Sequence, residues 1–344
     1  MKRISLAVLA LLVILALGAA WWLSEHYQAQ LDTPMALDAS ERFQLEPGQG
    51  LRSVSRTFAE RGWVDSAWVL EAYGRRQGIA PRLQAGEYAV TPGMTPRELI
   101  HAMARGEVVQ HRLTFPEGWT IRQALAALRE HPELIGPAES VGVDNLLEAL
   151  GLEDLGHPEG WFLPDTYFFG SGTEALTVLQ RAHQAMRLHL DRAWEDRIED
   201  HPVSSPYELL ILASIIERET GRGDERDRVA GVFVNRLKRG MRLQTDPTLL
   251  YAQEPGVQRL TRAELDRDHP YNTYTRAGLP PTPIALPGRA ALQAAARPGE
   301  TNDLFFVSRG DGSHHFSETY REHREAVIRY QLGGDGSRYG IRNR

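Results

Sequence analysis

The chain has 344 residues, a hydrophobic content of 42% and a net charge of −6, which is enough apolar material for two globular domains. The acidic balance, without a long basic run, argues against nucleic acid as a partner. Cysteine is absent and Lys2 and Lys238 are the only lysines, so disulfides and cysteine metal sites are excluded and Schiff-base chemistry is disfavoured. We expect no cofactor and no metal site.

Residues 4–23 form an uncharged run that, at 1.5 Å per residue in a helix, spans about 30 Å, the thickness of a bilayer core. Two basic residues precede the run, so the positive-inside rule places the N-terminus in the cytoplasm. We predict that residues 1–24 are a transmembrane anchor in the inner (cytoplasmic) membrane and that the rest of the chain lies in the periplasm. A cleaved signal peptide is the alternative, because Gly18 and Ala20 have the spacing of a cleavage site.

Residues 25–41 are predicted to be a polar linker. Beyond it, a short strand, a Pro-Gly turn and a helix begin at Phe43, and the same pattern begins again at Glu87, with one more helix between them. This strand–helix–helix–strand order over residues 42–110 is similar to the LysM carbohydrate-binding module. A purely structural α+β unit is the alternative.

An aromatic-rich loop is expected over residues 159–168. Its aromatic side chains, Trp161 among them, and its acid Asp165 suit stacking on a saccharide and hydrogen bonding to it. Ordinary core packing is the alternative for such an aromatic cluster. A long amphipathic helix is predicted next, over residues 173–196.

Residues 205–221 predict a buried helix, because residues 209–216 are apolar on nearly all faces of a helix. Ser205 is the expected N-cap, in a capping box with Glu208, and Gly221 is the expected stop. The helix is therefore predicted to lie in the core of the larger domain.

Two glutamates end this helix two residues apart, and so lie about 200° apart around its axis. One turn before Glu219 lie Ile215 and Ile216, whereas small residues precede Glu217. Apolar neighbours disfavour the charged form of a carboxyl and raise its pKa, which suits a general acid, so Glu219 is the candidate acid. The alternative is that both are solvated carboxylates of a last helical turn.

The remaining elements follow from helical periodicity, strand alternation and turn residues. They are a helix over 225–239 capped by Asp224 and ended by Gly240, an extended segment over 242–248, a proline-rich loop over 253–287 that suits a cleft wall, a helix over 289–296, a hairpin of 303–307 with 314–317, and a helix over 318–332.

Seven separated motifs add a second kind of information; they lie at residues 159–166, 217–220, 235–237, 240–248, 271–274, 278–281 and 312–316. Together, in this order, they resemble the endolytic murein transglycosylase family, also called MltG or YceG-like, over essentially the whole chain. The resemblance implies an α+β protein with five parts: a transmembrane anchor at 1–24, a linker at 25–41, a small LysM-like domain at 42–110, a larger mixed α/β catalytic domain with the buried helix at 111–333, and a tail at 334–344.

Members of that family are lytic transglycosylases, which cut the MurNAc–GlcNAc bond inside peptidoglycan strands and leave a 1,6-anhydroMurNAc end. The resemblance implies that this chain terminates or trims nascent strands, with Glu219 as the catalytic residue, and that penicillin-binding proteins are partners. Glu217 and Asn235 are implied as supporting residues. The implied substrate-binding residues are Gln244, Thr245, Asp246, Tyr271, Asn272, Tyr274, Trp161, Asp165 and His314.

Other activities remain as alternatives. A lysozyme-like muramidase would pair Glu219 with Glu217 or Asp246 and use water as the acceptor. A non-catalytic peptidoglycan-binding scaffold would bind glycan through the LysM-like region alone. A zinc enzyme is disfavoured, because His314 and His315 are adjacent and no His-Glu-x-x-His motif occurs. Family members have also been labelled aminodeoxychorismate lyases, and the scarcity of lysine argues against that pyridoxal-phosphate chemistry.

Overall fold

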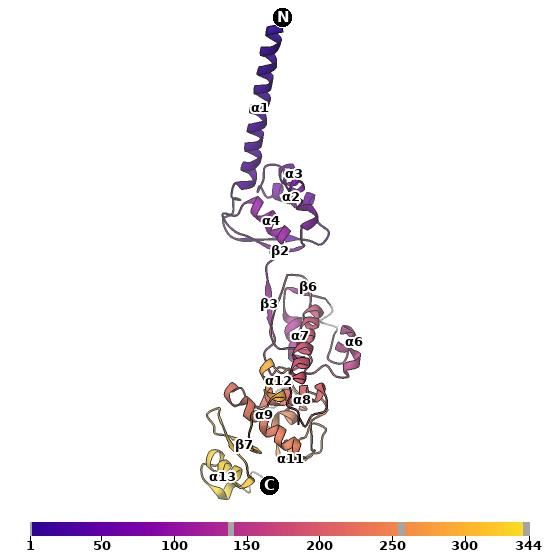
Figure 1. Ribbon diagram of the computed structural model, residues 1–344, viewed down its shortest axis with the longest axis vertical. Coiled ribbons are helices and arrows are strands. Elements are labelled where there is room, and N and C mark those ends of the chain that lie inside the picture. Colours follow the sequence, from indigo (N-terminus) through magenta and orange to yellow (C-terminus); the bar gives the residue numbers. More distant parts are fainter. Residues whose placement is uncertain (1, 137–140, 254–258, 340–344) are drawn as a thin grey trace. The chain divides into compact units, whose positions relative to one another are not determined.

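A computed structural model describes residues 2–136, 141–253 and 259–339 of the chain (Figure 1). The side chains of residues 2–9, 19, 20 and 23 are not among those described. The chain divides into two compact units, Met1–His111 with Phe168–Thr173 and Arg112–Tyr167 with Glu174–Arg344, and each is treated by itself.

The first unit contains the predicted strand–helix–helix–strand order. Strands β1 and β2 pair antiparallel with Phe43 opposite Tyr88, and both side chains are buried in its core with Phe58 and Leu99. The mixed α+β character expected for this unit is therefore confirmed. Its elements are α1 (Lys2–Asp32), β1 (Glu41–Leu45), α2 (Leu51–Glu60), α3 (Ala67–Arg76), the 3-10 helix Ala80–Arg82, β2 (Gly86–Val90) and α4 (Pro96–Arg105).

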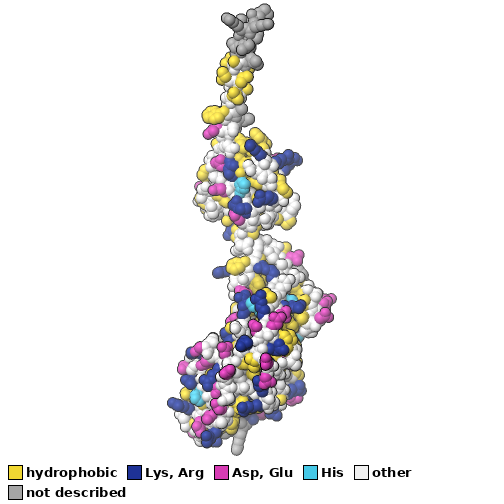
Figure 2. All heavy atoms as spheres, viewed as in Figure 1, with side chains coloured by type: hydrophobic (Ala, Val, Ile, Leu, Met, Phe, Trp, Pro, Cys, Tyr) yellow, Lys and Arg dark blue, Asp and Glu magenta, His cyan; other side chains and the backbone are white. Residues whose placement is uncertain are grey.

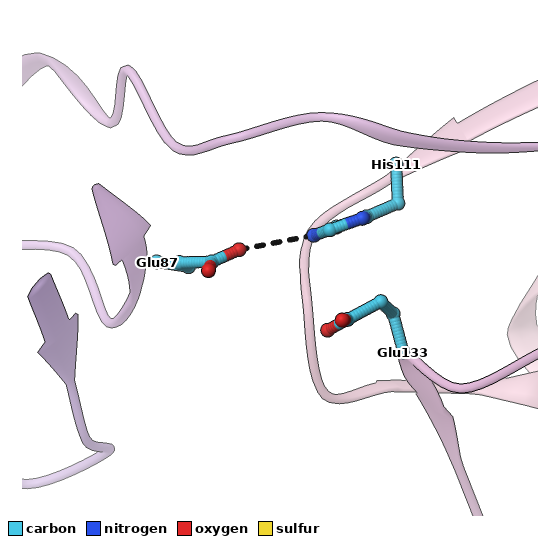
Figure 3. A group of neighbouring side chains, drawn as sticks. All are labelled: Glu87, His111 and Glu133. Atoms are coloured by element: carbon cyan, nitrogen blue, oxygen red, sulfur yellow. Dashed lines mark hydrogen bonds and ion pairs between the residues drawn. The ribbon is translucent and has the colours of Figure 1, made fainter. Parts of the chain in front are cut away.

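The chain leaving the first unit is held along β2. The Val109 N–H donates to the Glu87 carbonyl at 2.7 Å. Figure 3 shows the contact between the Glu87 carboxylate and the His111 ring. Glu87 Oε2 lies 3.0 Å from His111 Nε2, and Glu87 Oε1 lies 3.7 Å from Arg42 Nε. Residues 109–111 are thus tied to the strand by backbone and side-chain contacts.

The prediction of a polar linker over residues 25–41 is wrong. Helix α1 continues to Asp32, and Leu31 and Met35 are buried in the core of the first unit. Arg97 of α4 donates to both carboxylate oxygens of Asp32, at 2.5 and 2.9 Å. Tyr27, one helical turn before Leu31, packs against the same core, so one face of the end of α1 is turned onto it.

The predicted anchor at residues 1–24 falls on α1, and part of it lies outside the described side chains. Within the described residues, no helix combines the length and the apolarity needed to cross a bilayer. Figure 2 shows hydrophobic side chains in yellow along the described part of α1. Its large exposed apolar side chains are Leu11, Leu12, Val13, Ile14, Leu15, Leu17, Trp21 and Trp22.

The second unit is mainly helical. The described strands beyond β2 pair in two-stranded sheets, β3 with β5, β4 with β6 and β7 with β8, and β3, β5 and β6 have residues on both sides of the division between the units. In the antiparallel β7–β8 hairpin, Phe306 lies opposite Phe316, as predicted for a hairpin here. The elements are β3 (His111–Thr114), α5 (Ile121–Glu130), β4 (Leu134–Ile135), α6 (Leu146–Leu150), the 3-10 helix Glu153–Leu155, β5 (Thr166–Phe169), β6 (Thr173–Glu174), α7 (Ala175–Glu195), α8 (Pro206–Glu219), α9 (Gly223–Lys238), α10 (Asp246–Tyr251), α11 (Arg262–Asp266), α12 (Arg289–Ala296), β7 (Phe305–Ser308), β8 (His314–Ser317), α13 (Tyr320–Gln331) and the 3-10 helix Gly336–Arg338.

Helix α8 is the buried helix predicted from its apolar run. Every side chain from Leu209 to Ile216 is at most 3% exposed, and α7, α9 and α12 pack around it (Figure 1). One buried polar side chain on it is also used: Ser214 Oγ accepts from the Ile284 N–H at 3.0 Å. The helix is thus held on all sides, and its C-terminal turn is a rigid support for side chains.

Both ends of α8 differ in detail from the prediction. Ser205 caps the helix by accepting from the Glu208 N–H, but the Glu208 carboxylate reaches back to Ser204 rather than to Ser205. The helix ends on Thr220 in extended conformation, and Gly221 has no left-handed backbone. Glu219 is therefore the last helical residue.

The prediction of an extended segment over 242–248 is wrong for the C-terminal part of that segment. Helix α10 begins at Asp246, and Pro247 occupies its first turn. Proline suits that position, because the first helical N–H groups lack an intrahelical acceptor in any case and the fixed φ is already helical. The proline starts a helix here instead of interrupting a strand.

Candidate active site

The two glutamates at the end of α8 make different contacts. Glu217 Oε2 accepts from the Gly288 N–H at 2.9 Å, and Glu217 Oε1 lies 4.0 Å from Arg226 Nη2 of α9. Gly288 is the N-cap residue of α12, so the carboxylate also lies at the positive end of that helix. Glu217 of α8 thus connects three helices, because it contacts α12 through Gly288 and α9 through Arg226.

Glu219 is half-buried and contacts a different segment. Its Oε1 accepts a short hydrogen bond from the Thr245 hydroxyl. Thr245 is 2% exposed, and its N–H donates to Thr273 Oγ1 at 3.0 Å while its carbonyl accepts from the Thr248 hydroxyl at 2.9 Å. The hydroxyl that meets Glu219 is therefore fixed by its own neighbours.

A strained backbone residue brings Thr245 to this position. Gln244 has φ of 50°, the positive-φ conformation that non-glycine residues adopt at a cost of about 1 kcal/mol or more. Its N–H donates to the Thr273 carbonyl at 3.1 Å, which holds the turn. Such strain persists where the surrounding structure enforces it, and it often accompanies a functional site.

Arg236 of α9 enforces this turn, and sequence reasoning did not single it out. The side chain is 7% exposed; Nε donates to the Leu304 carbonyl at 2.6 Å, and Nη1 donates to the carbonyls of Arg242 at 3.1 Å and Leu243 at 2.8 Å. The available signal was its spacing: Arg236 follows the buried Phe233 by one helical turn and so shares its inward face.

Burial raises the pKa of Glu219 to about 6; the Thr245 hydroxyl opposes the rise, Asp246 adds to it, and the charges of His314 and Arg236 reduce it. Burial raises the pKa of Glu217 as well, so a raised pKa does not distinguish the two acids. The contacts do: Glu217 binds a backbone N–H and faces a guanidinium, whereas Glu219 accepts from a neutral hydroxyl.

Several predicted site residues lie around Glu219. Asp246 directly follows Thr245 in the chain, and its Oδ1 accepts from the Tyr274 hydroxyl at 2.5 Å. The exposed Gln244 accepts from Arg236 Nη1 at 3.3 Å. His314 acts on the pKa of Glu219 through its charge and is itself held by Glu225, with Nδ1 2.7 Å from Oε2. The structure therefore brings Gln244, Thr245, Asp246, Tyr274 and His314 together with Glu219.

Trp161 and Asp165 lie elsewhere. Trp161 stacks on Tyr207 with ring centroids 5.7 Å apart, near the first turn of α8, and twelve residues of helix place Tyr207 about 18 Å from Glu219. Asp165 Oδ2 accepts from Arg289 Nη2 at 2.5 Å, at the start of α12 where Glu217 also binds. These two residues do not belong to the immediate surroundings of Glu219.

Three other predicted residues organise loops. Asn272 is fully buried, and its amide donates to the backbone carbonyls of residues 264, 265 and 267. The Tyr271 hydroxyl lies 2.7 Å from Thr282 Oγ1. The Asn235 amide donates to the carbonyls of Thr301 and Asp303, at 2.8 and 3.1 Å. Their contacts shape the walls around the site.

The arrangement supplies one carboxyl with a raised pKa, suited to giving up a proton near neutral pH, amid hydrogen-bonding side chains. A second carboxyl, that of Asp246, is nearby but is already hydrogen-bonded to Tyr274. Glu217 lies on the other side of the helix and is occupied. Among the described residues at this site, Glu219 is therefore the carboxyl best suited to transfer a proton.

The chain is similar to several known proteins. Residues 43–329 match the YceG-like family. An endolytic murein transglycosylase of Bacillus subtilis (strain 168) is 28% identical over 302 residues, which cover 83% of this chain and 83% of that protein. An endolytic murein transglycosylase of Streptococcus pneumoniae serotype 2 (strain D39) is 27% identical over 361 residues, covering 94% of this chain and 65% of that protein. The crystal structure of a yceG-like protein of Listeria monocytogenes is 28% identical, with a TM-score of 0.53 over 83% of this chain and 99% of that one.

Proposed function

Because the chain belongs to the YceG-like family, we propose that it is an endolytic murein transglycosylase, a lytic enzyme that cuts peptidoglycan glycan strands internally. The observation that carries the proposal is Glu219, a half-buried carboxyl with a pKa of about 6 held by a neutral hydroxyl at the end of a rigid helix. No other group at this site combines a free acidic proton with such support among the residues that the structure describes.

One carboxyl is enough for a lytic transglycosylase. Protonated Glu219 gives its proton to the glycosidic oxygen between MurNAc and GlcNAc, and the bond from that oxygen to C1 of MurNAc breaks. The C6 hydroxyl of the same MurNAc attacks C1, and the Glu219 carboxylate takes the hydroxyl proton. The acid is regenerated, a 1,6-anhydro ring forms, and no water is consumed. Attack within one sugar also carries the large effective concentration of a tethered nucleophile.

The neighbouring side chains have proposed roles in holding the sugars. Gln244, Asp246, Tyr274 and His314 lie around Glu219 and offer amide, carboxylate, hydroxyl and imidazole groups to sugar hydroxyls and acetamido groups. The Thr245 hydroxyl keeps the Glu219 carboxyl in one orientation. We assign Trp161 to sugars several units from the cut, because an endolytic enzyme holds strand on both sides of the bond.

Product analysis tests the proposal against a lysozyme-like muramidase. Hydrolysis calls on two carboxylates and adds a water, so it leaves reducing ends, whereas the proposed reaction leaves 1,6-anhydroMurNAc ends that lack that water. Full-length protein in detergent is incubated with purified glycan strands, and the fragments are identified by mass spectrometry. We expect internal cuts with anhydro ends; reducing ends would establish hydrolysis, and uncut strands that still bind the protein would favour a scaffold.

The rate of cleavage is expected to fall as pH rises through about 6. Glu219 must carry a proton to act as the acid, and above its pKa the protonated fraction drops about tenfold per pH unit. Thr245→Val removes a hydrogen bond that lowers this pKa, so in that variant the decline should begin at higher pH. Initial rates of the wild-type protein and of Thr245→Val are measured between pH 4 and 9, a range that extends about two pH units or more on either side of the pKa of Glu219. An unchanged curve in the variant would contradict the assignment of the titrating group.

Further proposals concern the place of action. The uncharged run at residues 4–23 supports a single-pass anchor in the cytoplasmic membrane, with the catalytic unit in the periplasm near nascent strands. Release of the full-length chain from membranes by alkaline carbonate alone would contradict the anchor.

The β1–α2–α3–β2 arrangement supports a LysM-like glycan-binding role for the first unit. Penicillin-binding proteins are the proposed partners.

A further inference from the structure

Besides the two glutamates at the end of α8, the second unit contains a glutamate that is fully buried. Glu159 is 1% exposed, and its Oε1 accepts from the Ile121 N–H at 2.9 Å. Ile121 is the first residue of α5, so the carboxyl satisfies one of the helix's free N–H groups and lies at the positive end of its dipole. A buried carboxyl is costly unless its oxygens are bonded, and this one has its second oxygen bonded too.

The second oxygen connects Glu159 to α10. Glu159 Oε2 accepts from the Tyr251 hydroxyl at 3.2 Å, and Tyr251 is the last residue of α10. The Tyr251 ring also packs against Tyr271, with centroids 5.3 Å apart. One end of the short helix is therefore tied to the start of α5 through a single buried carboxyl.

The other end of α10 is the catalytic end. The helix begins at Asp246, directly after Thr245, whose hydroxyl binds Glu219. Within the helix, the Thr248 hydroxyl donates to the Thr245 carbonyl at 2.9 Å. Six residues of helix span about 9 Å, too short to bend easily, so a shift at Tyr251 reaches Thr245.

We propose that Glu159 is a positioning residue for the glycan-cleaving site, an inference that rests on the proposed function. It holds the Tyr251 hydroxyl, the hydroxyl fixes α10, and α10 sets Thr245 against the catalytic carboxyl. Catalysis is sensitive to such placement, because a displacement of about 1 Å can lower the rate about 100-fold.

The surroundings of Glu159 keep this support in one place. Gly160 has φ of 86°, and a Cβ atom there would lie 2.6 Å from Pro283, so the turn after Glu159 packs directly on the loop that lines α8. Burial raises the pKa of Glu159 to about 7, while the Ile121 N–H, the Tyr251 hydroxyl, the Gly160 N–H and the charge of Arg122 oppose the rise. These four groups favour the carboxylate that accepts from Tyr251.

Tyr251→Phe is the sharpest test, because it removes the hydroxyl and keeps the ring against Tyr271. In full-length protein acting on soluble glycan strands, we expect kcat to fall about tenfold with KM within about twofold, since substrate contacts are intact and the acid is misplaced. We also expect the fall in rate with pH to move to higher pH, because a displaced Thr245 lowers the pKa of Glu219 less.

Tyr167→Phe is the matched control. Tyr167 is also a buried tyrosine, and its hydroxyl donates to the Leu163 carbonyl at 2.6 Å, away from α10. Both variants remove a buried tyrosine hydroxyl that donates a hydrogen bond, so both are expected to lose thermal stability, but only Tyr251→Phe should change kcat. Equal effects of the two variants on kcat would overturn the proposal, because they would show a general loss of stability.

A double variant separates this inference from the proposed function. If Glu159 acts through Tyr251, Glu159→Ala with Tyr251→Phe should lower kcat no further than Glu159→Ala alone. Normal kcat in Tyr251→Phe, together with an inactive Glu219→Gln, overturns the positioning role and leaves the transglycosylase assignment standing. Activity in Glu219→Gln overturns both.

Discussion

Glu219→Gln is expected to lower the rate of glycan cleavage about 1,000-fold while the protein stays folded. The amide keeps the size of the side chain and can still accept from the Thr245 hydroxyl. It cannot give a proton to the leaving oxygen, and loss of a general acid typically costs about 10² to 10⁴ in rate. The measurement is the initial rate of anhydro-end formation by full-length protein, with circular dichroism to confirm folding.

Glu217→Gln is the matched control, since it makes the same chemical change two residues away in the same helix. Its amide oxygen can still accept from the Gly288 N–H, and the loss concerns the neighbouring Arg226. We expect the rate to fall less than tenfold, through support of α12 and not through proton transfer. Cleavage by Glu219→Gln above one-tenth of the wild-type rate, or a greater loss in Glu217→Gln, would reverse the two assignments.

Arg236→Met should lower the free energy of unfolding of the second unit by about 3 kcal/mol or more. The substitution removes donors to the carbonyls of Leu304, Arg242 and Leu243, which remain buried without those partners. Hydrogen bonds to a charged group contribute about 1.5 to 3 kcal/mol each, and an unsatisfied buried acceptor adds its own cost. The change is measured by urea unfolding, as the difference in the free energy of unfolding between the wild-type protein and Arg236→Met.

Activity should fall with Arg236→Met as well, even below the unfolding transition. The guanidinium holds the turn at Gln244, and that turn places the Thr245 hydroxyl against the catalytic carboxyl. Arg236→Lys keeps the charge and loses the fork of donors, so an intermediate effect on both quantities is expected.

The matched control for this change is Arg276→Met. Arg276 makes an exposed ion pair with Asp268, with Nη2 2.8 Å from Oδ2, and exposed pairs contribute little to stability because solvent screens them. A similar loss of stability in both arginine variants would show that burial is not what makes Arg236 important.

The single-acid site accounts for the chemistry. A hydrolase needs a second carboxylate free to activate water or attack the sugar, and the two neighbours of Glu219 are both engaged, Glu217 with α12 and α9 and Asp246 with Tyr274. A substrate that supplies its own nucleophile avoids that requirement. The occupied neighbours are therefore consistent with anhydro-ring formation.

Local patterns were sufficient for most helices, and they selected Glu219 as the candidate acid. The predicted bounds of α12 equal those in the structure. The predicted bounds of the core helix α8 and of the β7–β8 hairpin differ from those in the structure by two residues or fewer. Periodic burial and capping act within one or two turns of chain, so a short window of sequence contains their causes. The choice of Glu219 over Glu217 rested on the same local spacing.

Long-range packing decided the rest. The partner of Glu219 is 26 residues away at Thr245, that of Arg236 is 68 residues away at Leu304, and that of Glu159 is 92 residues away at Tyr251. Hydrogen-bond partners so distant are chosen by how helices and loops pack, which periodicity does not encode. For this reason the sequence predicts the polar side chains of the proline-rich loop only as a set. The folded chain separates those that lie beside Glu219 from those, such as Asn272, that are buried and hold the loop in place.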